Sequence, residues 1–390
     1  MGPRRSSPGE IFVAFLGLGL TAFGGPVAHV GFFREVIVVR RGWLDDRDFT
    51  DLVALAQFLP GPASSQVGIA IGATRAGLAG ALAAWVGFTA PSAILMALFA
   101  LVITRVDTGA GWLNGLKLAA VAVVARAVWA MARRLCPDRA RASLALVAAV
   151  VVIAWPGSGG QMAALLGGAL VGWAMLGHDD DDLPGAAPSA TIDRRLAVAS
   201  LAVFAILLAA LPLAARLWPT TTVVMVDGFF RAGALIFGGG HVILPMLEAV
   251  VVPSGWVDRD VFLAGYGAAQ AIPGPLLSFS AYLGMTIIGV AGAALALGAA
   301  FLPSFLLVLG VLPFWEMLRR RRAARTAMRG VNAAVVGLLL AALYDPVWIG
   351  AVSTPLDVAL VLAAVGALAL WRMPPWLVVG LCAAAGEIIG

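Results

Sequence analysis

Two glycine–proline clusters interrupt apolar stretches near the start of the chain, and they are the first residues whose types suggest chemistry. They are Gly24-Gly25-Pro26 and Pro60-Gly61-Pro62. Proline lacks an amide hydrogen and blocks the preceding turn, and glycine loosens the backbone, so each cluster is expected to break a helix. Proline also suits the first turn of a new helix. Ser64 and Ser65 should then lie at a helix N-terminus with free N–H groups, which is a favourable place for an anion.

The same clusters return in the second half of the chain, as Phe237-Gly238-Gly239 and Pro273-Gly274-Pro275. Ser278 follows the second of these, as Ser65 follows the first. A single proline in a membrane helix is usually explained as a packing kink. Breaks at equivalent points of two halves favour a functional role instead, because freed backbone groups in hydrocarbon survive only inside protein or beside a wet cavity.

Charged residues inside apolar stretches are the second clue, since they are costly in a membrane and usually face a partner or a pathway. Lys117 and Arg126 lie in one apolar stretch. We expect them about 13 Å apart, near one helix face, where they could neutralise a dianion. The alternative is that Arg126 snorkels and Lys117 lies near an interface. Asp227 and Arg231, four residues apart, predict a structural ion pair.

Two acids and two histidines beside the breaks are candidates for carrying protons. They are the equivalent pairs Glu35 with Glu248 and His29 with His241. A carboxylate in a partly dry site can exchange protons with its surroundings, and histidine titrates near neutral pH. A salt bridge with Arg34 or a nearby arginine is the competing explanation for Glu35, whereas Glu248 has no basic neighbour in sequence.

Catalytic and metal-binding constellations are missing from the sequence. The chain has three histidines in no metal-binding spacing, and it has no Walker P-loop and no GxSxG nucleophile motif. Cys136 and Cys382 form no ligand pair. We therefore expect neither an enzyme, nor a metal site, nor a cofactor.

The elements that position these residues must lie in a membrane. Of the 390 residues, 61% are hydrophobic and 12% charged, whereas soluble domains carry roughly a quarter charged residues. The net charge is +5, and Lys117 is the only lysine among 26 basic residues. The arginines cluster between apolar stretches, which is typical of cytoplasmic loops. The sequence has no soluble basic face with interleaved aromatic residues, so it does not predict a nucleic-acid partner.

An internal duplication is the strongest feature of the sequence. Ordered matches recur at an offset of 212 to 214 residues, where chance would match only alanines and leucines. The matching residues are Phe23-Gly24-Gly25 with Phe237-Gly238-Gly239, His29 with His241, Glu35 with Glu248, Gly42-Trp43 with Gly255-Trp256, Gln57 with Gln270, Pro60-Gly61-Pro62 with Pro273-Gly274-Pro275, Ser65 with Ser278, Gly77 with Gly289, Gly80 with Gly292, and Pro91-Ser92 with Pro303-Ser304.

Apolar segments long enough for helices fill both halves. We expect them at 11–32, 51–73, 77–104, 112–131, 142–155 and 161–177, then at 196–217, and then at 225–247, 261–285, 287–312, 330–345, 356–371 and 374–390. This predicts an all-α polytopic membrane protein with about 13 transmembrane segments. The domains are a repeat over 1–177, a linker with one extra helix over 178–224, and a second repeat over 225–390.

An odd number of crossings before the second repeat inverts its topology relative to the first. With the N-terminus in the cytoplasm, the arginine clusters at 133–141, 194–195 and 319–329 all fall inside. The basic loop at 34–47 would fall outside, although Glu35, Asp45, Asp46 and the adjacent Asp48 neutralise it. That loop would move inside if segments 11–32 and 51–73 were re-entrant rather than spanning. Inverted repeats with broken helices are common in secondary transporters.

These residues together resemble the chromate ion transporter family in its long, two-domain form. The resemblance rests on FGGP at 23–26, RRGWLDDRDF at 40–49 and QFLPGP at 57–62, with FGGGH at 237–241, GWVDRDVF at 255–262 and QAIPGP at 270–275. It implies a multi-pass protein of the bacterial inner membrane that exports chromate, driven by the proton gradient or the membrane potential. Gly240 stands where the first half has Pro26, so the two half-sites should differ.

Other functions stay open at this point. Sulfate is a tetrahedral dianion like chromate, so a sulfate carrier is the nearest alternative. An integral-membrane lipid-phosphate phosphatase or flippase is an alternative from another class, but it should carry an acid–serine–arginine cluster near a break. Ser64 and Ser65 have no arginine nearby in sequence before Arg75. As partners we expect the oxyanion and the lipid bilayer, and we allow for a homodimer.

Overall fold

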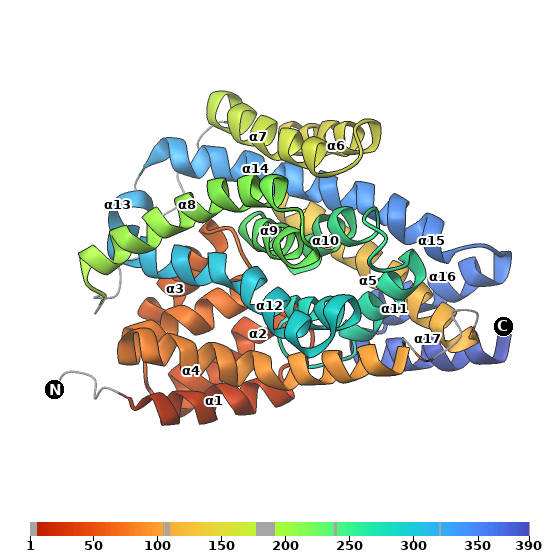
Figure 1. The fold of residues 1–390 in the computed structure, drawn as a ribbon, viewed down its shortest axis with the longest axis horizontal. Coiled ribbons are helices and arrows are strands. Elements are labelled where there is room, and N and C mark those ends of the chain that lie inside the picture. Colours follow the sequence, from red (N-terminus) through yellow and green to blue (C-terminus); the bar gives the residue numbers. More distant parts are fainter. Residues whose placement is uncertain are drawn as a thin grey trace.

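A computed structural model of the protein describes residues 6–103, 105, 110–176, 192–237, 240–319 and 321–389, and within them the chain forms helices and no strand (Figure 1). In chain order the elements are α1 (Pro8–Thr21), α2 (Gly25–Phe33), η1 (Arg34–Arg40), α3 (Asp46–Phe58), α4 (Ala63–Ile103), α5 (Gly111–Leu135), α6 (Arg139–Ala154), α7 (Ser158–Met175), α8 (Arg194–Leu217), α9 (Thr221–Ala234), η2 (Gly240–Val242), α10 (Ile243–Val251), α11 (Arg259–Ala269), η3 (Leu276–Ser278), α12 (Phe279–Val311), η4 (Leu312–Phe314), α13 (Trp315–Arg319), α14 (Arg322–Ala342), η5 (Leu343–Trp348), α15 (Ile349–Ala351), α16 (Pro355–Ala369) and α17 (Pro375–Ile389).

Several of these helices are suited to a bilayer. Within the described residues, five helical stretches are long and apolar enough to cross a membrane: Ala63–Ile103, Gly111–Leu135, Arg194–Leu217, Leu276–Arg319 and Arg322–Ala351. Shorter apolar helices accompany them. The prediction of an all-α polytopic membrane protein is therefore confirmed. The expected segments 11–32 and 51–73 each contain two helices separated by a break, because glycine and proline interrupt them.

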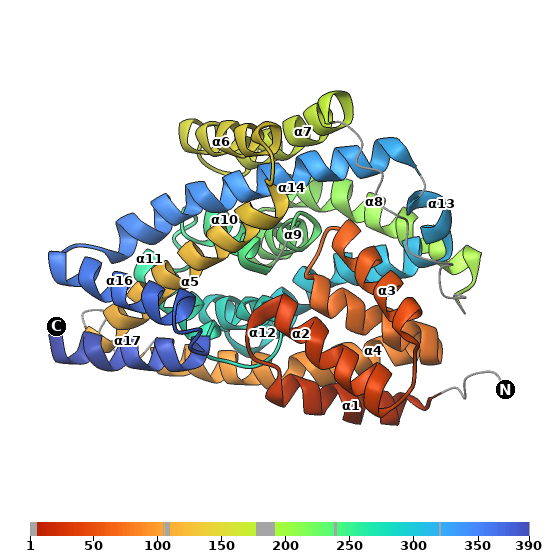
Figure 2. The same ribbon diagram turned by 180° about the vertical axis from the view of Figure 1, so that it is seen from behind.

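The helices form a bundle in which the two halves of the chain are interleaved. Helices α1 and α4 lie along one edge, and α6 and α7 lie beyond α14 on the opposite side (Figure 1). Helix α5 crosses the molecule obliquely between α14 and α17 (Figure 2). It packs against α17, α11 and α16, all of which come from the second half.

The long helices α4 and α12 are bent at equivalent glycines. In α4 the bend lies at Gly77, with φ +60° and ψ −147°, and in α12 it lies at Gly289, with φ +71° and ψ −153°. A positive φ is readily available only to glycine. The bend brings Gly72 against Gly80, so that a β-carbon on Gly80 would lie 2.2 Å from the carbonyl oxygen of Gly72. Gly284 and Gly292 meet in the same way in α12.

Close helix crossings also recur in equivalent pairs between the halves. Helix α5 packs on α17 where Gly115 meets the backbone of Cys382, and α14 packs on α7 where Gly330 meets the backbone of Gly168. A β-carbon at either Gly115 or Gly330 would lie about 2 Å from a carbonyl oxygen. In each pair one helix of one half packs against the last helix of the other half.

Buried polar contacts add further ties. Arg319 donates to Asp51 at 3.0 Å, and their side chains are 6% and 1% exposed. This pair joins α3 of the first half to α13 of the second, and removing one partner of such a pair typically costs about 3–5 kcal/mol. The predicted ion pair between Asp227 and Arg231 is confirmed, with Nε to Oδ1 at 2.9 Å.

The bend in α4 predicts a stability effect. Gly80→Ala should lower the melting temperature of the purified protein, because the added methyl group has to displace the backbone of Gly72. Overpacking of this kind costs about 1–3 kcal/mol. Gly298→Ala is the matched control, since Gly298 also lies in a long helix but has no atom within 4 Å of its β-carbon position. Equal melting temperatures for the two variants would contradict the close crossing.

Candidate functional site

The four main-chain breaks of the two halves meet. The N–H group of Gly61 donates to the carbonyl oxygen of Ile236 at 2.5 Å, and the N–H group of Gly274 donates to the carbonyl oxygen of Ala22 at 3.0 Å. Gly61 and Gly274 are equivalent residues, and so are Ala22 and Ile236. The Pro-Gly-Pro turn of each half is therefore hydrogen-bonded to the glycine-rich break of the other half. These two hydrogen bonds join the broken regions of the two halves to each other.

The helix ends explain why these backbone groups are available. Helix α1 ends at Thr21 and α2 begins at Gly25, while α3 ends at Phe58 and α4 begins at Ala63. In the second half α11 ends at Ala269 and η3 begins at Leu276. The three predicted breaks that lie wholly within the described residues are confirmed. Each new helix begins with N–H groups that have no partner within that helix.

Each Pro-Gly-Pro turn also lies against a serine from the long helix of the other half. A β-carbon on Gly61 would lie 2.8 Å from Oγ of Ser304 in α12, and one on Gly274 would lie 2.8 Å from Oγ of Ser92 in α4. No side chain larger than hydrogen fits at either glycine without displacing these hydroxyls. Gly61 has φ +134°, which also favours glycine.

Buried polar atoms collect around the breaks. Several side-chain atoms there have no hydrogen-bond partner among the described residues: Ser65 Oγ, Gln66 Oε1, Thr89 Oγ1, Gln270 Nε2, Ser280 Oγ and Ser304 Oγ. Buried polar groups of proteins are normally hydrogen-bonded. A cluster of such atoms beside free helix N-termini is suited to a polar ligand or to water.

The two histidines hold the breaks in place. Nδ1 of His29 lies 3.2 Å from Oγ of Ser64, and Nδ1 of His241 lies 2.9 Å from the hydroxyl of Tyr266. His29 is 2% exposed. The first contact joins α2 to the start of α4, and the second joins η2 to α11. Both predicted histidines are therefore part of the break region.

The cations of α5 have different partners. Nζ of Lys117 is paired with Asp260 at 3.1 Å, whereas Arg126 is exposed and lies within electrostatic range of His241. The expectation that Lys117 and Arg126 share a helix face is wrong, because nine residues are two and a half turns of a helix. Arg134, which belongs to the arginine cluster at 133–141, donates to Gln57 at 3.0 Å beside the first Pro-Gly-Pro turn.

The acidic candidates are paired with arginines. Glu35 accepts from Arg40 at 3.0 Å on the surface. Glu248 is more enclosed, with its side chain 16% exposed, and lies 3.7 Å from Arg259, which also contacts Asp345 at 3.1 Å. Glu248 has no basic neighbour in sequence, but the fold brings Arg259 close to it.

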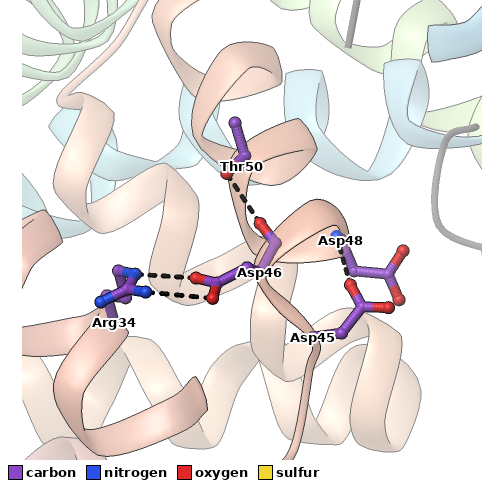
Figure 3. Close-up of polar contacts among 5 residues, drawn as sticks. All are labelled: Arg34, Asp45, Asp46, Asp48 and Thr50. Atoms are coloured by element: carbon purple, nitrogen blue, oxygen red, sulfur yellow. Dashed lines mark hydrogen bonds and ion pairs between the residues drawn. The ribbon is translucent and has the colours of Figure 1, made fainter. Parts of the chain in front are cut away.

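The loop at 34–47 is neutralised by contacts within itself. Arg34 makes a bidentate pair with Asp46 at 2.7 and 3.0 Å, and Asp45 caps α3 by accepting from the N–H group of Asp48 (Figure 3). Arg259 occupies the position equivalent to Asp46, and Glu248 occupies the position equivalent to Glu35, which is next to Arg34 in the chain. The two halves thus join the same elements with pairs of opposite polarity.

The remaining predicted residues are distributed as follows. Gly24 and Gly25 form the turn between α1 and α2, with φ values of +99° and +79°. Pro62 and Pro275 immediately precede α4 and η3, and Ser278 is buried at the end of η3. Gly238 and Gly239 lie outside the described residues. Sequence reasoning missed Gln66, Thr89, Ser280 and Ser304 as site residues, although the repeated Pro-Ser pair containing Ser304 was a signal for the last of them.

Comparisons with known proteins identify relatives of this chain. A family model described as chromate transporter matches residues 9–173 and 223–387. A chromate transport protein of Pseudomonas aeruginosa is 28% identical over 88% of this chain and 82% of its own length. A chromate transport protein of Cupriavidus metallidurans is 26% identical over 85% and 81%. An uncharacterised transporter of Methanocaldococcus jannaschii is 25% identical over 87% and 84%. No solved structure matches the chain.

The first Pro-Gly-Pro turn gives a direct test of the site. Gly61→Ala should reduce oxyanion movement in everted membrane vesicles roughly tenfold or more, because the methyl group displaces Gln66 and Ser304 and shifts the turn. Gly255→Ala is the control, since Gly255 also has a positive φ of +70° but open space around its β-carbon position. The comparison is made at equal amounts of folded protein. If both variants move the oxyanion equally well, the turn is not part of the site.

Proposed function

This chain belongs to the chromate transporter family, and we propose that it exports chromate across a bacterial inner membrane as a secondary active transporter. Relatives with the name chromate transport protein support the substrate. The apolar helices support residence in a membrane. The proposal includes the direction of transport and its energy source, which is the proton gradient or the membrane potential, since the sequence contains no nucleotide-binding motif.

The architecture that we propose is a pair of inverted repeats with about 13 crossings. The repeats cover 1–177 and 225–390, the linker with its extra helix covers 178–224, and the N-terminus is cytoplasmic. Reciprocal contacts support this plan, because Gly61 bonds to Ile236 as Gly274 bonds to Ala22. Contacts that exchange between halves are expected when the halves are related by a pseudo-two-fold axis.

The observation that carries the function is the meeting of the two Pro-Gly-Pro turns with the breaks of the opposite halves. We propose the oxyanion site there, at Gly61 and Pro62 with Ser64 and Ser65, and at Gly274 and Pro275 with Ser278. Helix N-termini and hydroxyl groups donate hydrogen bonds, which the four oxygens of a tetrahedral anion accept. Arg126 and Arg134 supply positive charge near the second and first breaks.

Sulfate remains the second candidate substrate, because it presents the same four oxygens and the same charge. A lipid-phosphate phosphatase receives no support. Its chemistry needs an arginine beside the acid and the serine, but Arg75 contacts Ser6 and the carbonyl oxygen of Trp43. The family consists of transporters, and this chain is a transporter and not an enzyme.

Proton coupling is best assigned to Glu248. Its side chain is more enclosed than that of Glu35, and Arg259 links it to Asp345 across three elements, α10, α11 and η5. A proton on Glu248 would weaken its attraction to Arg259 and leave Arg259 paired with Asp345. Protonation at this position could therefore change how α10 is held against α11.

Everted membrane vesicles test the proposed function directly. Chromate should accumulate inside vesicles that contain the protein and should not accumulate in empty vesicles or after an uncoupler is added. Sulfate is added as a competitor in a parallel series. Strong competition would indicate a general site for tetrahedral dianions. Vesicles that accumulate sulfate but not chromate would replace the proposed substrate, and vesicles that accumulate neither would contradict the function.

A change at Glu248 tests the coupling. Glu248→Gln should flatten the dependence of chromate accumulation on the pH gradient, because the amide keeps the shape of the side chain and cannot carry the proton. Glu35→Gln should keep the wild-type pH profile, since Glu35 is exposed and paired with Arg40. An unchanged profile in Glu248→Gln rules out this residue as the proton carrier.

A further inference from the structure

We propose that the two breaks are not equivalent and that one oxyanion per chain is held at the first, between the start of α4 and Ser304 of α12. This inference rests on the proposed function and assigns its binding residues more narrowly. Ser304, which comes from the second half of the chain, is a binding residue for the anion. Ser65 is the partner hydroxyl on the first turn of α4.

Ser304 is in a position to donate to a ligand. Its side chain is fully buried, and its hydroxyl has no hydrogen-bond partner within the part of the chain that the structure describes. It faces Gly61, since a β-carbon there would lie 2.8 Å from its oxygen. A buried hydroxyl without a partner, aimed at a turn that opens a helix, is suited to an acceptor that enters from outside the chain.

The start of α4 provides the other donors. Ser65 is 2% exposed, and its hydroxyl is also unpartnered among the described residues. The first N–H groups of α4 point the same way along the helix axis and carry the positive end of its dipole. Gln66 fixes the turn, because its Nε2 donates to the carbonyl oxygen of Pro60 at 2.6 Å. This bond closes the turn that contains Gly61 and Ser65.

The equivalent position in the second half is built differently. Ser92 corresponds to Ser304, but its hydroxyl already donates to the carbonyl oxygen of Thr89 at 3.0 Å. Phe279 stands in place of Gln66 and stacks on Tyr282 with ring centroids 5.5 Å apart. Phe262 packs edge-on against the ring of Phe279, with ring centroids 5.3 Å apart. An aromatic side chain therefore stands in the second half where Gln66 fixes the turn in the first half.

Unpartnered atoms also occur near the second break, at Thr89, Ser280 and Gln270. They do not reproduce the first site, because the hydroxyl of Ser92, which corresponds to Ser304, is already bonded within α4. His241 and Tyr266 are also bonded to each other at this break. The second break is thus held together by its own side chains. We assign to it the role of a packed support, and to the first break the role of the ligand cradle.

Calorimetric titration of the full-length protein in lipid nanodiscs with sodium chromate tests the assignment. Ser304→Ala should weaken chromate binding about tenfold or more, which corresponds to the loss of one hydrogen bond to a charged group. Ser92→Ala is the matched control and should stay within about twofold of the wild type. The wild type should bind one chromate per chain. Melting temperatures measured alongside show whether each variant is folded.

Ser65→Ala provides a second, independent variant, so that a folding defect in Ser304→Ala does not decide the result. It should weaken binding to a similar extent. Equal effects of Ser304→Ala and Ser92→Ala, or a stoichiometry of two, would overturn the single cradle while leaving chromate binding intact. A wild-type protein that binds no chromate would overturn the proposed function itself, and the cradle with it.

Discussion

The structure depends on satisfying backbone groups that are released inside an apolar bundle. A helix that stops in hydrocarbon exposes N–H and C=O groups at a cost of several kcal/mol each. Here each half provides hydrogen-bond partners for the broken backbone of the other, since the N–H group of Gly61 donates to Ile236 and that of Gly274 donates to Ala22. Neither half could close its own breaks in this way. The interleaving of the halves is thus a condition for having breaks at all.

Glycine makes that interleaving sterically feasible. Gly72 and Gly80 let α4 fold back on itself, and Gly115 and Gly330 let α5 and α14 approach the last helix of the opposite half. Without a strong hydrophobic force between helices in lipid, such close contacts provide much of the association. The glycines of the repeat therefore matter at two levels, as turns in the backbone and as surfaces for packing.

Much of this could be predicted from the sequence, because the signals were local or repeated. Proline and glycine at fixed places predicted the helix ends near Thr21, Phe58 and Ala269. Which break pairs with which half could not be predicted, since duplication shows equivalence and not contact. The partners of Lys117 and Glu248 could not be predicted either. Asp260 and Arg259 are separated from them in sequence, and only the fold brings each pair together.

The halves have kept their backbone pattern and changed their side chains, which bears on how such a protein could transport in one direction. The glycines that form breaks and crossings are matched between the halves. The polar residues are not, because Gln66 corresponds to Phe279 in the repeat, and Asp46 corresponds to Arg259, the partner of Glu248. A matched backbone allows two similar end states of a moving bundle. Unmatched polar groups allow those states to differ in their affinity for an anion and in their response to charge. The asymmetric cradle that we propose, set in a backbone whose two halves match, would provide both properties in one chain.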